Sequence, residues 1–142
     1  MILTDVYVLV YAYRQESPLH DGYAKWLSRV TSGSEELGLV DAVLIGFLRI
    51  VTNPRIYAEP APTASALAFV DGLRHARRRR WLAPTSAGWE SLASLVGGDP
   101  QVRVNLVPDA WLAALALAHG CRLATADRGF ARFAGLDWFV PA

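Results

Sequence analysis

The chain has 142 residues, of which 53% are hydrophobic, 11% are aromatic and 19% are charged, and its net charge is +1. This composition predicts a single globular domain over residues 1–142, large enough to bury a core without disulfides or a structural metal, and it excludes a disordered chain. A charge so close to zero also excludes a protein that holds nucleic acid by bulk charge alone.

Strand and helix patterns alternate along the chain. The apolar run from Met1 to Thr4 predicts a first strand, and the β-branched residues of Val6 to Val10 would by propensity continue it. Further strands are expected at residues 37–40, 81–82 and 121–124, and helices at 19–30, 42–51, 63–76, 86–96 and 108–119. Thr63 is a candidate helix cap, and Gly120 is expected to stop the last helix. Strands alternating with helices predict a parallel α/β sandwich.

Nothing in the sequence predicts a membrane protein or a secreted one. The longest apolar stretches, such as Val6 to Tyr13, are too short to span a bilayer, and the start of the chain lacks the basic segment of a signal peptide. Cys121 is the one cysteine, so no internal disulfide can form. We therefore expect a cytoplasmic protein and leave secretion by another route open.

Three aspartates follow predicted strands or begin a predicted helix. Asp5 follows the first strand, Asp127 follows the last, and Asp109 starts the late helix after Pro108. Taken singly, Asp109 could be a cap and Asp127 a turn residue. In an open parallel sheet, however, ligands bind outside the carboxyl ends of the strands, so Asp5 and Asp127 can share one crevice. Carboxylates placed together favour a hard divalent cation, which is typical of phosphodiester chemistry.

Three blocks of the sequence also carry a family resemblance. They are MILTDVYVLVYA at the start, GFLRIVTNPRI at residues 46–56 and LVPDAWLAALALAHGCRLATADRGFARFAGLDW at residues 106–138. With them the chain resembles a PIN-domain protein, and in particular the VapC toxins of bacterial toxin–antitoxin pairs. The resemblance implies a PIN-like three-layer α/β/α sandwich with a short, mainly parallel central sheet. It also makes Val6 to Val10 part of the first helix, and we expect this helix rather than the strand, because packing easily overrides propensity. It also implies an endoribonuclease that depends on Mg²⁺ or Mn²⁺, cuts RNA, forms a homodimer and is silenced by a VapB-like antitoxin.

The family's site residues carry over by position. Asp5, Asp109 and Asp127 match its acidic metal ligands, and Thr125 matches the hydroxyl that commonly precedes the last acid. Two positions depart from the pattern. Tyr7 stands where members often have Asn or Ser, and Gly46 stands where many carry a Glu. The departure at Gly46 removes a fourth carboxylate.

Asp41 is the candidate replacement for that carboxylate. It lies where the strand at residues 37–40 meets the next helix, a third junction of the same kind. Position 46 would lie about 7.5 Å further along that helix and about 140° around it, so the two positions are not interchangeable on a rigid helix. The alternative is that Asp41 only caps the helix. Both interpretations stay open at this stage.

Positive charge is concentrated in one short stretch. It contains Arg74, Arg77, Arg78, Arg79 and Arg80. The planar guanidinium group binds phosphate through two oxygens, so the cluster could hold RNA beside the cleft with a salt-sensitive affinity. A contact with an antitoxin and a solvated helix end are the alternatives.

The mechanism expected from these residues is metal-assisted hydrolysis of RNA. Metal held by Asp5, Asp109 and Asp127, with or without Asp41, would activate a water for attack on phosphorus, and Thr125 would orient a carboxylate or that water. Two alternatives remain. One is a degenerate PIN module that binds RNA or a partner without cutting, and the other is a nuclease that acts on structured DNA.

Overall fold

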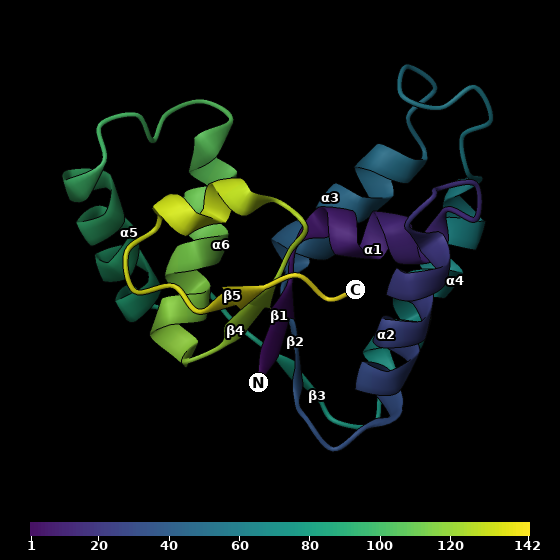
Figure 1. Ribbon diagram of the computed structural model, residues 1–142, viewed down its shortest axis with the longest axis horizontal. Coiled ribbons are helices and arrows are strands. Elements are labelled where there is room, and N and C mark those ends of the chain that lie inside the picture. The colour runs from purple at the N-terminus through teal and green to yellow at the C-terminus, as the bar shows by residue number, and fades with distance from the viewer.

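The computed structural model describes residues 1–142 and is built around a five-stranded sheet. The strand order is β3-β2-β1-β4-β5, and every neighbouring pair is parallel (Figure 1). The strands are β1 (Ile2–Thr4), β2 (Leu37–Leu39), β3 (Arg79–Trp81), β4 (Arg122–Ala124) and β5 (Trp138–Phe139). The prediction of a short, mainly parallel sheet is confirmed, although β5 was not expected.

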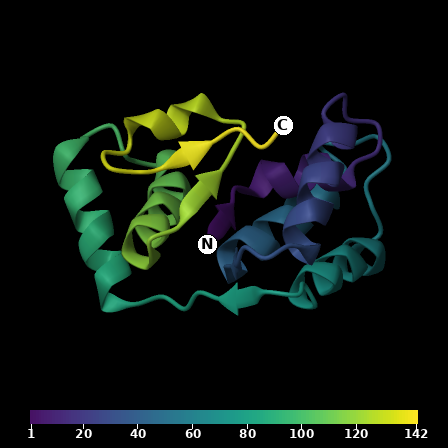
Figure 2. The same ribbon diagram turned by 60° about the horizontal axis from the view of Figure 1, so that its bottom comes forward.

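Six α-helices and a short 3-10 helix surround this sheet. They are α1 (Val6–Tyr13), α2 (His20–Ser32), α3 (Asp41–Val51), α4 (Thr63–Arg74), α5 (Ser86–Gly98), α6 (Leu106–His119) and the 3-10 helix η1 (Arg128–Arg132). Helices α1 to α4 gather on one side of the sheet and α5 and α6 on the other, as two views of the molecule agree (Figures 1 and 2). The α/β sandwich expected from the sequence is therefore present.

The segment Val6–Tyr13 is helical, although its first residues favour a strand by propensity. The reason is packing. Val8, Leu9 and Val10 are almost fully buried, and α1 lies against both α2 and α3. Removing a continuous apolar surface from water outweighs the small intrinsic preference of valine for extended backbone.

Helix α6 begins at Leu106, two residues before the predicted start, and ends where expected. Pro108 falls in its first turn, where a missing N–H breaks no bond within the helix. Gly120 ends the helix in the left-handed conformation, with φ of 65°, which suits a residue without Cβ. Asp109 therefore lies in the first turn of α6.

Thr63, the predicted cap of α4, is instead the first helical residue of that helix, after Pro62.

The parallel pairing determines where the ends of the strands lie. Ile2 pairs with Leu37 and with Arg122, so the carboxyl ends of β1 and β4 meet at one edge of the sheet. The residues that follow these strands, Asp5 and Thr125, are therefore brought side by side. No helix is both long and apolar enough to cross a membrane.

Candidate active site

Three carboxylates line one hollow at the carboxyl edge of the sheet. The hollow has a volume of about 320 Å³ and is lined by Asp5, Tyr7, Tyr11, Asp109, Ala126 and Asp127. The three aspartates predicted from the sequence are thus brought together from β1, α6 and the loop after β4. None of the lining residues carries a positive charge.

Asp5 is the buried member of the three. Its backbone N–H donates to the Ala124 carbonyl oxygen at 2.9 Å, which continues the β1–β4 pairing beyond the last residue of β1. Asp5 is only 7% exposed. Burial raises the pKa of the Asp5 carboxyl, a hydrogen bond from Thr125 opposes that rise, and the negative charge of Asp127 adds to it. Asp5 is therefore a carboxylate whose charge lacks a compensating cation.

Thr125 connects the two strand ends through its hydroxyl. The side chain is fully buried, and its Oγ1 donates to Asp5 Oδ2 at 2.8 Å across 120 positions of sequence. The same oxygen accepts the backbone N–H of Asp127 at 3.0 Å. One hydroxyl thus positions two of the three acidic residues.

Asp127 holds the turn into η1 with one of its oxygens. Its Oδ1 accepts the Gly129 backbone N–H at 2.7 Å, while the residue as a whole is exposed. A Cβ at position 129 would lie 2.9 Å from this oxygen, so glycine suits the turn. No hydrogen bond occupies the second oxygen, Oδ2, which is available to a ligand of the hollow.

Asp109 has a strongly raised pKa. Its carboxyl is partly buried, and burial followed by the negative charges of Asp5 and Asp127 raises its pKa to about 6. A group so placed holds a proton below about pH 6 unless a cation replaces it. Raised carboxyl pKa values in a hollow are typical of functional sites.

The donor set suits a hard divalent cation, although the carboxylates do not converge on one point. Nowhere do three His, Cys, Asp or Glu side chains come close enough to ligate a single ion together. Mg²⁺ retains several waters and uses only one or two carboxylates directly, so direct and water-mediated contacts could share the three. A cation would also remove the repulsion that raises the pKa of Asp109.

Comparison with known proteins identifies the family. The PIN-domain family profile matches residues 2–136. Ribonuclease VapC43 of Mycobacterium tuberculosis is 41% identical over 141 residues, which cover 99% of this chain and 95% of that protein. The chain belongs to the VapC group of PIN-domain proteins. Ribonuclease VapC25 of the same organism is 36% identical, with 99% of both chains covered.

The fold of a solved VapC-containing complex agrees with this membership. The chain aligns with a structure of VapBC2 from Rickettsia felis bound to a promoter DNA fragment, at a TM-score of 0.71 and 17% identity. The alignment covers 99% of this chain and 98% of the other. At that identity the comparison supports the fold alone.

Asp41 lies away from the three acids of this VapC-family site. It is exposed in the first turn of α3 and lines a separate hollow of about 240 Å³ with Trp81 and Trp111. Val40 is the N-cap of α3, and no side chain caps this helix. A side chain at position 46 would start 3.2 Å from Val6, the residue after Asp5. The position of the missing Glu therefore packs against the residue that follows Asp5, whereas Asp41 is not among the residues that line the acidic hollow.

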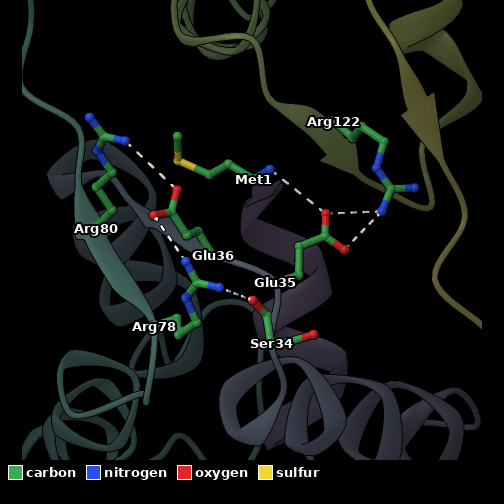
Figure 3. A network of polar contacts seen from close by, with 7 residues as sticks. All are labelled: Met1, Ser34, Glu35, Glu36, Arg78, Arg80 and Arg122. Carbon is green, nitrogen blue, oxygen red and sulfur yellow. Dashed lines mark hydrogen bonds and ion pairs between the residues drawn. The ribbon is translucent and has the colours of Figure 1, made fainter.

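Most of the arginine cluster lies at the amino end of β3, whereas the acidic hollow lies at the carboxyl ends of β1 and β4. Arg78 donates to the Ser34 carbonyl oxygen at 2.6 Å, and both Arg78 and Arg80 pair with Glu36 at 3.7 Å (Figure 3). Glu35 forms ion pairs with Arg122 at 3.1 Å and with the amino group of Met1 at 3.7 Å. Of the others, Arg74 pairs with Asp71, Arg79 donates to the Ala76 carbonyl oxygen, and Arg77 forms no ion pair. The structure does not bring this cluster to the acidic hollow.

Two tyrosines at the site were not recognised as site residues from the sequence. Tyr7 and Tyr11 are four residues apart on α1, so they lie on one face of the helix and both line the hollow. The signal was available, because a helix that starts right after Asp5 places position 7 beside that carboxylate.

Proposed function

We propose that this protein is a metal-dependent endoribonuclease toxin that hydrolyses RNA phosphodiester bonds and is neutralised by a VapB-like antitoxin. The observation that carries the proposal is the gathering of Asp5, Asp109 and Asp127 in one hollow that no positive side chain lines. Relatives that match nearly the whole chain are named ribonucleases. A carboxylate site that lacks its own cation is suited to bind a metal and, through it, phosphate.

Each residue has a defined part in this proposal. Asp5, Asp109 and Asp127 would hold Mg²⁺ or Mn²⁺, which when bound activates water and stabilises the leaving oxygen. Thr125 orients Asp5 through the hydrogen bond from its hydroxyl and orients the backbone of Asp127 through the N–H that this hydroxyl accepts. Asp109 must release its proton to take up the ion, so metal binding weakens below about pH 6.

The partners form part of the same proposal. The VapBC2 comparison structure is a toxin–antitoxin complex by its own description, and we extend that kind of partner to this chain. We propose that the chain also forms a homodimer and acts on RNA in the cytoplasm, where the unpaired Cys121 needs no disulfide partner.

A metal titration coupled to RNA cleavage tests the activity. We expect products that depend on Mg²⁺ or Mn²⁺, and Asp5→Asn should abolish them without unfolding the protein. Asp21→Asn is the matched control, because Asp21 is exposed on α2 and takes no part in the hollow. Cleavage by Asp5→Asn at the parent rate, with contaminating nuclease excluded, would refute the proposal.

A non-cutting module is the second candidate. Its support is the incomplete convergence of the carboxylates together with Gly46 and Tyr7 at two positions of the family pattern. Binding of RNA with no metal-dependent products would favour it. Parallel digestion of RNA and of structured DNA decides between the ribonuclease and a deoxyribonuclease.

A further inference from the structure

An aromatic surface forms one wall of the acidic hollow. Tyr7 and Tyr11 line it together with the three carboxylates, and their ring centroids are 5.9 Å apart at an interplanar angle of 43°. Tyr7 is 44% exposed, although it follows the buried Asp5 by only two residues. Its ring is therefore available to a ligand that occupies the hollow.

The ring of Tyr7 is backed by a rigid row. Tyr11 packs edge-on against Tyr23 at 5.3 Å, and Tyr23 is only 2% exposed. His20 Nδ1 lies 3.1 Å from the Tyr11 carbonyl oxygen, which joins the start of α2 to α1. A supported aromatic side chain loses little conformational freedom when a ligand stacks on it.

The chemistry of the hollow indicates which part of RNA this wall would contact. The carboxylates repel phosphate and would meet it only through a cation, whereas a tyrosine ring attracts the flat face of a base. Bases can stack on protein side chains when they are unpaired, since those of an intact duplex are stacked on each other. Tyr7 thus complements the carboxylates, with one contact for the base and the other for the adjoining phosphate.

We propose that Tyr7, supported by Tyr11, is a base-stacking residue that makes this site select single-stranded RNA. The inference rests on the proposed function, because it takes RNA as the ligand. Base stacking is favoured over contact with a protein partner because Tyr7 lines the same small hollow as the three acids.

Binding measured without cleavage tests the role of Tyr7. All proteins carry Asp5→Asn to stop hydrolysis, and the probes are a short fluorescein-labelled oligoribonucleotide, its blunt duplex and an abasic version. Tyr7→Leu should weaken binding of the single strand about tenfold, whereas Tyr7→Phe should preserve it, because stacking requires the ring and not the hydroxyl. The abasic strand should bind the Tyr7→Leu protein and the parent protein with the same affinity, since this strand has no base to stack.

Trp89→Leu is the matched control. Trp89 is an aromatic residue 61% exposed on α5, outside the hollow, so its loss should leave RNA binding unchanged. Equal affinity of the Tyr7→Leu protein and its parent for the single strand would overturn the proposal, and so would an equal loss for intact and abasic strands. Weakened antitoxin binding with unchanged RNA binding would overturn it too, in favour of a protein contact.

Failure of this inference can be told apart from failure of the proposed function. If the unmodified chain cuts RNA but Tyr7→Leu has no effect on binding, the stacking role is wrong and the nuclease stands. If the unmodified chain cuts nothing while binding still depends on Tyr7, the stacking role stands in an RNA-binding module.

Discussion

Replacing Asp109 by Asn should stabilise the metal-free protein at neutral pH while it abolishes RNA cleavage. The carboxyl pKa of Asp109 is raised from 3.8 to about 6, first by burial and then by the charges of Asp5 and Asp127. Between these two pH values the folded protein binds a proton that the unfolded chain does not. Stability therefore falls as pH rises through this window, and the full penalty is present above it.

The size of the effect follows from the shift. Two pKa units correspond to about 3 kcal/mol at about 1.4 kcal/mol per unit. The carboxyl is partly open to solvent, which screens the charge, so we expect a gain of about 1–2 kcal/mol for Asp109→Asn near pH 7. The gain should shrink to about zero near pH 4, where both carboxyl and amide are neutral.

Urea denaturation in the presence of a chelator measures this difference. Asp41→Asn is the matched control, because Asp41 also lies in the first turn of a helix but has an exposed carboxylate. That variant should lose up to about 0.5 kcal/mol, since it removes a favourable charge at the positive end of the helix dipole. Adding Mg²⁺ should stabilise the parent but stabilise Asp109→Asn much less. A parent as stable as Asp109→Asn near pH 7, or a gap that does not vary with pH, would refute the reasoning.

Three further predictions concern single side chains. Thr125→Val should destabilise the fold by about 2 kcal/mol in urea titrations, more near pH 7 than near pH 4, because ionised Asp5 loses a buried donor; equal loss at both pH values would contradict this. Asp41→Asn should cleave RNA at the parent rate, because Asp41 lines another hollow, and a large drop in rate would restore it to the site. Arg128→Gln should weaken RNA binding and make the plot of log binding constant against log salt concentration shallower by about one unit of slope. The reason is that Arg128 follows Asp127, is exposed and forms no ion pair, and an unchanged slope would exclude a phosphate contact.

The parts of the fold that could be predicted are those with a local physical signal. Gly120 ended a helix as expected because glycine readily adopts the left-handed conformation that commonly closes a helix, and the apolar run before Asp5 formed the expected strand. Strand β5 could not be foreseen, since two residues give no periodicity and form a strand only by pairing with β4. Helix α1 contradicted propensity because burial on two sides outweighs it.

The candidate site was predictable to the extent that it depends on strand direction. Asp5 and Asp127 follow parallel neighbours and so had to share an edge. For Asp41 the same argument fails, because β2 has the same direction but its following helix opens onto a different hollow. The arginines could not be placed from sequence, since their pairing with Glu36 joins segments 42 to 44 residues apart.

The position of β1 in the middle of the sheet determines when, during synthesis, the proposed site can form. One of its two neighbours is β4, so Asp5 meets Thr125 only after 120 further residues exist. A nascent chain that ends before residue 122 carries its first acid but cannot assemble the hollow around it. Residues 1–125 must therefore all be synthesised before the proposed site can form. We therefore expect shorter nascent chains to lack the proposed nuclease activity.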